Sequence, residues 1–245
     1  MKHFEIKVLV ENASELAAND QEAFGLIRRQ GIGASDTAAL LGVSPFPNGT
    51  TQELIYQKQA KYMTAAELAI GQMVNVRKGN DLEPLILAKF MKMYKVEDVS
   101  KPSAMYGIVG TPLTVNFDGI MGVGAYMIPV ECKFISSYGG KYYNFSKCMS
   151  PNELSYGKEL MPLADNLTDE AYIMARANEA GIPVYYYTQV QQQMMGLNAP
   201  FCYLTCLAEK DWESRTFCIM RDERVQQLIL DTAEVVWARV KAGIA

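Results

Sequence analysis

The alternation of hydrophobic and polar residues along the chain predicts a mixed α/β protein. Short alternating or apolar runs, bounded by glycine and other turn residues, predict strands over residues 1–10, 104–109, 113–118, 126–134, 201–208 and 216–221. Patterns with helical spacing predict helices over residues 17–29, 37–41, 81–94, 168–180, 185–197 and 222–242. The order of these elements favours an α/β core with a mixed central sheet flanked by helices.

Two capping signals predict further helices between residues 50 and 78. Thr50 with Glu53, and Thr64 with Glu67, have the spacing of capping boxes, in which each side chain bonds a backbone N–H of the other residue. We therefore expect helices that begin at these threonines and run through residue 59 and toward residue 78.

Length and composition favour one soluble domain. The chain has 245 residues, 49% of them hydrophobic and 20% charged, and no proline- or serine-rich linker divides it. We therefore expect a single domain over residues 1–245. No apolar run is long enough to span a bilayer, and the first ten residues lack the features of a signal peptide. The expected location is the cytoplasm of a bacterial host cell, without membrane association.

The histidine and cysteine content and the net charge limit the kinds of functional site that the chain can form. His3 is the only histidine, which argues against histidine zinc sites, Ser-His-Asp triads and histidine-metal nucleases. The five cysteines include no CxxC pair and indicate buried thiols rather than a disulfide framework. A net charge of −4 disfavours a protein that coats nucleic acid, because such coating requires neutralisation of phosphates. A nuclease with a local basic groove beside an acidic metal site remains compatible.

One segment carries candidate chemistry. Glu131 and Lys133 lie two residues apart on a predicted strand and therefore share a face, which Asp118 can reach from the preceding strand of a hairpin. The two carboxylates and the Cys132 carbonyl could bind Mg²⁺, or Mn²⁺ in its place, and leave positions for water and a phosphate oxygen. Lys133 could then orient the attacking water or help to deprotonate it. An exposed strand with a cross-strand ion pair would produce the same pattern.

Four separated motifs occur in one order along the chain. They are Arg28 followed by Gly31-Ile-Gly-Ala-Ser-Asp36, then Gly79-Asn-Asp-Leu-Glu83-Pro84, then Asp118 with Glu131-Cys-Lys133, and finally Gln189-Val-Gln191-Gln-Gln193. In this order they resemble the phage lambda exonuclease and YqaJ-type viral recombinase family, a branch of the PD-(D/E)xK nucleases. The resemblance covers residues 28–207, and the joint order is more specific than any single motif. It implies a restriction-endonuclease-like α/β core.

The resemblance also implies roles for individual residues. Asp118 and Glu131 would bind the catalytic magnesium ions, and Glu83 would complete the acidic shell. Lys133 would position the nucleophilic water, with Gln189 near the catalytic centre.

Some of these residues have structural alternatives. Glu83 could instead be a first-turn residue favoured by the helix dipole, with Pro84 in the first turn or at a kink in a longer helix. On a helix, residues two apart diverge by about 200°. Gln189 and Gln193 therefore share a face, whereas Gln191 could be ordinary surface polarity.

For Arg28 and Ser35 the resemblance implies a pocket for a terminal 5′-phosphate. Free N–H groups at a helix start, a hydroxyl and a guanidinium together suit a dianion. The alternative is that Ser35 or Asp36 only caps the helix over residues 37–41 and that Arg28 is solvated.

Residues 138–180 resemble an inserted segment, because the distance from the acidic motif to the glutamines is longer than is usual in the family. The insert could be a lid, an oligomer contact or a partner-binding surface. Its lysines and aromatic residues suit either a strand-binding patch or a solvated loop; they are Lys141, Tyr142, Tyr143, Phe145 and Lys147. The tyrosines at 185–187 suit stacking on a splayed base or core packing.

The resemblance implies a Mg²⁺-dependent 5′→3′ exonuclease that acts on the ends of linear double-stranded DNA. Such an enzyme leaves 3′ single-stranded tails for recombination by strand annealing. The implied partners are a single-strand annealing protein and further copies of the chain in a ring that encloses DNA, with a trimer favoured. A structure- or site-selective endonuclease on the same core, and a non-catalytic DNA-binding or interaction module, are the alternatives. The intact Asp118, Glu131 and Lys133 argue against the module.

Overall fold

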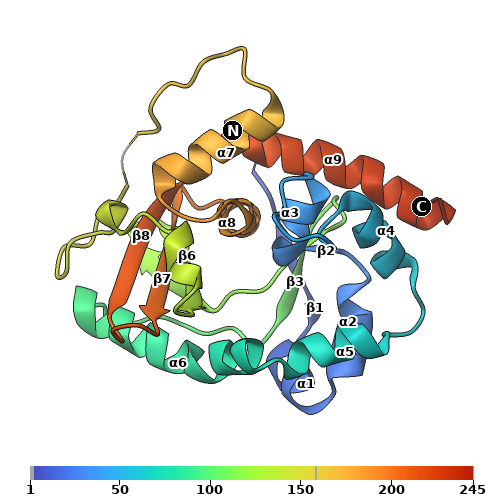
Figure 1. Ribbon diagram of the computed structural model, residues 1–245, viewed down its shortest axis with the longest axis horizontal. Helices are drawn as coiled ribbons and strands as arrows, with labels where there is room; N and C mark the ends of the chain where they lie inside the picture. Colours follow the sequence, from blue (N-terminus) through green and yellow to red (C-terminus); the bar gives the residue numbers. More distant parts are fainter. Residues whose placement is uncertain (1–2, 158, 245) are drawn as a thin grey trace.

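The strands of this protein form two mixed sheets (Figure 1). The computed structural model describes residues 3–157 and 159–244, without the side chains of residues 70–72, 75 and 76. The strands are β1 Ile6–Val10, β2 Ile32–Gly33, β3 Met105–Ile108, β4 Leu113–Val115, β5 Gly119–Val123, β6 Tyr126–Ile135, β7 Phe201–Ala208 and β8 Ser214–Met220. The first two residues of the predicted strand over 1–10 lie outside the described part.

Each sheet combines parallel and antiparallel pairing. The first has the order β1-β3-β4-β2 and the second β5-β6-β7-β8. The pairs β2–β4 and β6–β7 are parallel, and the other neighbours are antiparallel. The prediction of mixed pairing flanked by helices is therefore confirmed, although the strands form two sheets instead of one central sheet. Strand β5 was not predicted, because its two glycines resemble turn residues.

Helices surround both sheets. They are α1 Ala13–Asn19, α2 Gln21–Arg28, α3 Thr37–Leu40, α4 Thr51–Gln59, α5 Ala65–Gln72, α6 Val74–Tyr94, α7 Asp169–Ala180, α8 Val184–Leu197 and α9 Glu223–Ala242. Short 3-10 turns cover η1 Ala34–Asp36, η2 Gly139–Tyr142 and η3 Phe145–Lys147. None of the helices in the described ranges combines the length and the apolar composition that a membrane span requires.

Two predicted helices differ from the structure. The helix expected over residues 17–29 is divided, because the Asp20 side chain accepts the Ala23 N–H at 2.9 Å and begins α2. The helix expected from Asp81 begins earlier, at Val74, and continues through Pro84. Glu83 therefore lies in the middle of α6, and its interpretation as a first-turn residue is wrong.

The capping signals between residues 50 and 78 are confirmed. At the start of α5, Thr64 and Glu67 form both bonds of a capping box, at 2.7 Å and 3.2 Å. At the start of α4, the Thr50 hydroxyl accepts the Glu53 N–H at 3.1 Å.

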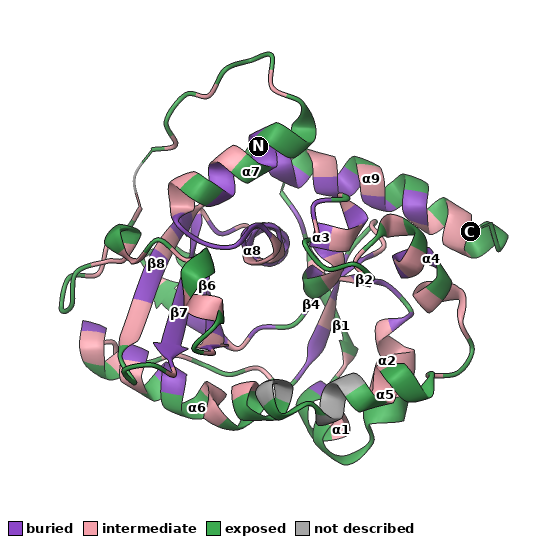
Figure 2. Cartoon of the chain, viewed as in Figure 1, coloured by how far each residue is buried: buried purple, intermediate pink, exposed green. Residues whose placement is uncertain are grey.

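Helix α8 occupies the centre of the molecule (Figure 1). It packs against β6 and β7 of one sheet and against β3 and β4 of the other, and it also contacts α3, α7 and α9. Helix α6 packs against β6, β7 and β8. Most of α8 and all of β7 are consequently buried (Figure 2). The strand that carries Glu131 is thus enclosed by helices, and the alternative of an exposed strand is wrong.

The inserted segment is only partly a solvated loop. The rings of Tyr143 and Phe145 pack on Phe217, and their centroids lie 5.9 Å and 6.5 Å from the Phe217 centroid. Lys141 and Tyr142 are exposed. Residues 148–157 and 159–168 contain no helix or strand.

A buried polar network joins three helices. The Asp222 carboxylate caps α9 by accepting the Val225 N–H at 3.1 Å. It also accepts hydrogen bonds from Tyr172 of α7 at 3.1 Å and Tyr187 of α8 at 3.4 Å. The Arg176 guanidinium lies 3.1 Å from the same carboxylate. Because Asp222 is only 2% exposed, these contacts are shielded from water.

We expect Asp222→Ala to lower the free energy of unfolding by about 3 kcal/mol, because it leaves Arg176 partly unpaired and two tyrosine hydroxyls without their acceptor. Urea unfolding measures the change. The matched control is Asp20→Ala, which removes an exposed N-cap and should cost about 1 kcal/mol. Equal losses in the two variants would contradict the stabilising role of the network.

Candidate active site

The structure brings the predicted acidic residues together. Glu131 and Lys133 lie on β6, which α8 covers, and Asp118 immediately precedes β5. Glu83 projects from the middle of α6, within electrostatic reach of Asp118. We call Glu83, Asp118, Glu131 and Lys133 the acidic centre.

The Glu131 carboxylate is bonded on both oxygens. Its Oε1 accepts a hydrogen bond from Gln189 at 2.5 Å and forms an ion pair with Lys133. Its Oε2 accepts a hydrogen bond from Gln193 at 2.6 Å, and the same amide donates to the Asn116 carbonyl at 3.1 Å. Gln189 thus lies beside Glu131, as the family resemblance implied. Gln193 was not assigned to the site, although its spacing from Gln189 indicated the same helix face.

Asp118, directly before the first residue of β5, contacts the backbone of β6. Its Oδ2 accepts the Cys132 N–H at 2.9 Å. Because the N–H and C=O of one strand residue point toward the same edge, the Cys132 carbonyl faces the side of Asp118. Two carboxylates and one carbonyl therefore surround the same stretch of β6.

The acidic centre carries surplus negative charge. Burial and the carboxylates of Glu131 and Glu83 raise the pKa of Asp118 well above its usual range. Burial disfavours the Lys133 ammonium, but the carboxylates of Glu131 and Asp118 outweigh this effect and raise its pKa. The raised pKa favours the ammonium form of Lys133, which can donate a hydrogen bond to water or to a phosphate oxygen.

Glu83 is held by a lysine that the sequence did not reveal as a site residue. The Lys101 ammonium lies 2.6 Å from Glu83 Oε1. Two backbone hydrogen bonds between Ser100 and Ile120, at 2.7 Å and 2.9 Å, attach this segment to β5. No local motif marks Lys101, because its position depends on pairing between distant parts of the chain.

The residues of the acidic centre fit a divalent cation. Hard cations of the Mg²⁺ type prefer carboxylate and carbonyl oxygens, which Asp118, Glu131 and the Cys132 backbone provide. The raised pKa of Asp118 shows a site in which added positive charge is favourable. Among the described residues, no three Asp, Glu, His or Cys side chains converge closely enough to hold an ion by themselves. The donor set that fits is therefore two carboxylates, a backbone carbonyl and water, with Glu83 paired to Lys101.

A second cluster lies at the start of α3, around Arg28 and Ser35. The Arg28 guanidinium donates to the Ser35 hydroxyl at 2.6 Å and lies 3.8 Å from Asp36. The Asp36 carboxylate accepts the Gly33 N–H at 2.9 Å and does not cap α3. The alternative in which Ser35 or Asp36 caps α3 is therefore wrong, whereas the Arg28 side chain is 42% exposed and remains partly solvated.

Lys58 completes this second cluster. Its ammonium donates to Asp36 Oδ2 at 2.7 Å and to the Arg28 carbonyl at 2.9 Å. Burial opposes ionisation of Asp36, but Lys58 and Arg28 outweigh it and lower its pKa. The cluster contains three charged groups with an excess of positive charge, which suits an anion.

The other two glutamines of α8 anchor the helix. Gln191 is 0% exposed, donates to the Met220 carbonyl at 2.8 Å and accepts the Asp222 N–H at 2.9 Å. The interpretation of Gln191 as surface polarity is therefore wrong. Gln192 donates to the carbonyls of Ile32 and Thr114, at 2.9 Å and 2.8 Å, and so joins α8 to β2 and β4.

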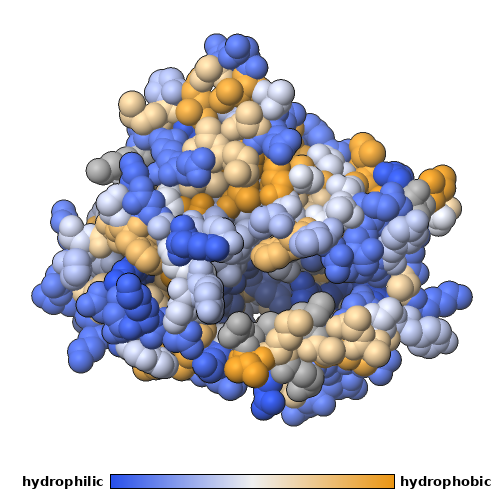
Figure 3. All heavy atoms as spheres, viewed as in Figure 1, coloured by the Kyte–Doolittle hydropathy of each residue, from blue (hydrophilic) through white to orange (hydrophobic). Residues whose placement is uncertain are grey.

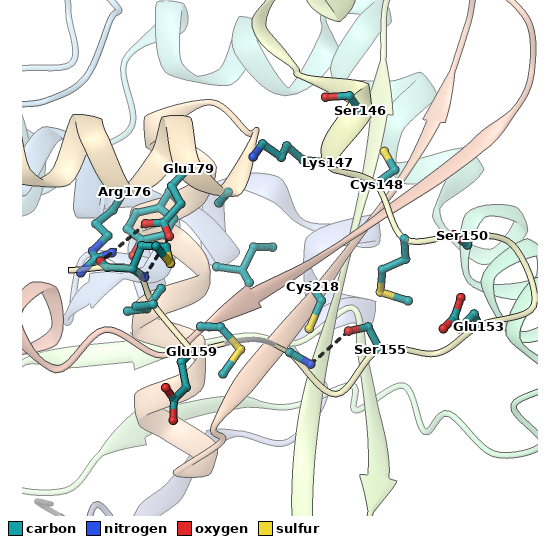
Figure 4. Close-up of a pocket in the computed structure, with 18 residues that line it drawn as sticks. Ser146, Lys147, Cys148, Ser150, Glu153, Ser155, Glu159, Arg176, Glu179 and Cys218 are labelled. Atoms are coloured by element: carbon teal, nitrogen blue, oxygen red, sulfur yellow. Dashed lines mark hydrogen bonds and ion pairs between the residues drawn. The ribbon is translucent and has the colours of Figure 1, made fainter. Parts of the chain in front are cut away.

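A pocket between η3, the segment that follows it, α7 and β8 lies apart from both clusters (Figure 4). Lys147, Arg176, Glu179 and Cys218 are among its lining residues, and Arg176 is paired with Glu179 at 2.7 Å. It contains no residue of the acidic centre and none of the Arg28–Ser35 cluster.

Comparison with known proteins gives matches in sequence and in structure. Residues 23–158 match the model of the YqaJ-like viral recombinase domain, whereas no curated protein matches the chain. An alkaline exonuclease (LHK-Exo) from Laribacter hongkongensis is similar in structure, with a TM-score of 0.56 and 17% identity over 88% of this chain and 90% of that one. LHK-Exo in complex with dAMP gives a TM-score of 0.52 and 18% identity over 89% and 91%. These likenesses confirm the predicted fold.

We expect Asp118→Asn to stabilise the metal-free protein at neutral pH. The pKa of Asp118 is raised in the folded protein, so folding favours the protonated form of its carboxyl group. The free energy of unfolding therefore falls as the pH rises through that pKa. Asparagine has no charge to bury. Its Tm at neutral pH should be higher by roughly 2–4 °C, the shift that 1 kcal/mol produces in a chain of this size.

Thermal unfolding across the acidic-to-neutral range measures this effect. The control is Asp165→Asn, on the exposed part of the inserted segment, which should leave Tm unchanged. A lower Tm for Asp118→Asn at neutral pH would show that the charge of Asp118 does not destabilise the metal-free protein.

Proposed function

The chain belongs to the YqaJ-like viral recombinase domain family, as the order of its motifs predicted, and from this premise we propose that it is a metal-dependent exonuclease acting on linear double-stranded DNA. Membership of this family supports the assignment of the chain as a nuclease of the phage recombination type. The observation that carries the proposal is the enclosed acidic centre, in which Asp118 and Glu131 flank Cys132 and Lys133 lies beside them. A non-catalytic module would have no use for so much buried charge.

Asp118, Glu131 and the Cys132 carbonyl would hold the cation, Mg²⁺ or Mn²⁺, and Glu83 would join them when released from Lys101. When bound, such an ion activates water and stabilises negative charge on a phosphate. Lys133 would donate a hydrogen bond to the attacking water or to the scissile phosphate. Gln189 would hold the Glu131 carboxylate in its orientation.

The Arg28–Ser35 cluster would bind the terminal 5′-phosphate. A guanidinium and a hydroxyl 2.6 Å apart can bond adjacent oxygens of a phosphate dianion, with Lys58 adding positive charge behind them. This cluster favours an enzyme that depends on a DNA end over the endonuclease alternative. Cleavage would therefore proceed 5′→3′ and leave 3′ single-stranded tails.

The surrounding surface suits a polynucleotide. The face of the molecule seen in Figure 3 is hollowed between the part that contains α3 and α8 and the part that contains α5 and α6. We assign this hollow to DNA. A net charge of −4 gives little general attraction for DNA, so a closed ring of identical subunits, a trimer, would keep the enzyme on its substrate.

The remaining parts of the proposal concern organisation. The chain would form one nuclease domain, with residues 138–180 as an insert. A single-strand annealing protein would coat the 3′ tails and complete recombination.

We expect Mg²⁺-dependent degradation of linear duplex DNA, with no cutting of a covalently closed circle of the same sequence. Lys133→Ala should reduce the rate by about 10²–10³-fold, the usual loss when a donor to developing negative charge is removed. Gel analysis of time courses with and without EDTA measures both effects. Lys92→Ala, an exposed lysine on α6, is the matched control.

Cutting of the closed circle would support the endonuclease instead. A rate that is independent of metal, or unchanged in Lys133→Ala, would refute the assignment of the acidic centre.

We expect the enzyme to prefer a 5′-phosphate over a 5′-hydroxyl end, and Arg28→Lys and Ser35→Ala to weaken this preference about tenfold, as expected for the loss of one charge-assisted hydrogen bond. Lysine keeps the charge but lacks the planar fork of arginine. Initial rates on the two matched duplexes measure the ratio. Arg224→Lys, on α9, is the control, and an unchanged ratio in both test variants would place the phosphate elsewhere.

A further inference from the structure

Three aromatic side chains form a row beside the acidic centre. Phe46 and Tyr185 have ring centroids 5.2 Å apart, and Tyr185 and Tyr186 have centroids 4.4 Å apart. The Lys133 ammonium lies 5.0 Å from the centroid of the Tyr186 ring. We call Phe46, Tyr185 and Tyr186 the aromatic row. It leads from the loop between α3 and α4 to the lysine of the acidic centre.

The outer end of the row is an exposed ring on an ordered loop. Phe46 is 57% exposed, whereas Tyr185 and Tyr186 are half-buried. The Ser44 hydroxyl accepts the Phe46 N–H at 3.3 Å, and the Phe46 carbonyl accepts the Gly49 N–H at 2.9 Å. The loop is also tightly packed, because a Cβ on Gly49 would lie 2.0 Å from the Ser44 hydroxyl. Its hydrogen bonds therefore hold Phe46 against Tyr185.

Core packing explains only part of this arrangement. Tyr187, the next residue along α8, is 1% exposed, and its hydroxyl bonds Asp222. The rings of the aromatic row are more accessible, and that of Phe46 is mostly in solvent. The exposed ring of Phe46 can therefore contact a ligand without any rearrangement of the core.

The position of the row indicates its ligand. Ser35 lies at the start of α3 and Phe46 in the loop that follows this helix, while Tyr186 lies at Lys133. A nucleotide with its 5′-phosphate at the Arg28–Ser35 cluster and its 3′-phosphodiester at the acidic centre would extend along the row. Its base, once released from pairing, would meet the aromatic rings.

We propose that the aromatic row stacks on the base of the 5′-terminal nucleotide and so holds the end of the cleaved strand apart from its complement. This inference rests on the proposed function. Stacking on aromatic rings tolerates every base, which suits an enzyme that must remove each nucleotide in turn. It would also offset part of the cost of opening the terminal base pair.

The test uses 2-aminopurine, whose fluorescence changes with stacking, at the 5′-terminal position of a 5′-phosphorylated duplex without divalent metal. The parent protein should change the fluorescence on binding. Phe46→Ala should abolish this change and weaken binding about tenfold, and Phe46→Trp should retain both. Tyr126→Ala, which removes an exposed ring at the far end of β6, is the matched control.

The outcomes separate this inference from the proposed function. If Phe46→Ala gives the same fluorescence change as the parent, or if 2-aminopurine responds only at an interior position, the stacking role is refuted while the nuclease stands. If the parent protein neither binds the phosphorylated end nor cuts linear DNA, the proposed function fails and this inference fails with it.

Discussion

The buried carboxylate of Glu131 is the constraint on which the rest of this structure depends. A charged group that is 2% exposed is tolerated only when ion pairs and hydrogen bonds replace its hydration. Lys133 supplies the opposite charge from the same strand, and Gln189 and Gln193 supply hydrogen bonds from α8. Both glutamines reach Glu131 only if α8 lies at one height and one rotation on β6, so the carboxylate fixes the register of the central helix.

The same charge makes added positive charge favourable at the centre. Asp118 and Glu83 add further negative charge near Glu131, and the pKa of Asp118 rises in response to burial and to both neighbours. Lys133 and Lys101 neutralise part of it. Functional sites commonly retain such unfavourable electrostatics, because they are paid for by stable packing elsewhere. Here the compensation includes the network around Asp222, which lies behind the same helix.

Local sequence patterns predicted where the helices and strands lie but not how deeply their side chains are buried. Short alternating or apolar runs identified β6 and β7, and capping boxes located the starts of α4 and α5 correctly. Pro84 misplaced the start of α6, because proline usually marks a first turn and here lies inside a long helix. Gln191 and Lys101 could not be assigned from the sequence, since burial and ion pairing depend on contacts between distant segments. Spacing on one strand placed Glu131 and Lys133 together, and the family resemblance placed Gln189 near them.

The glutamines of α8 also connect the two clusters that the proposed function requires. Gln189 and Gln193 bond Glu131 beside β6, while Gln192 bonds the carbonyls of Ile32 and Thr114 in the other sheet. Ile32 directly precedes the turn that carries Ser35, so one helix fixes the distance between the candidate phosphate site and the acidic centre. A distance held by buried side-chain hydrogen bonds varies less than one set by loops. If the enzyme cleaves one nucleotide from a bound DNA end, this helix is the part of the fold that keeps the cleavage position constant.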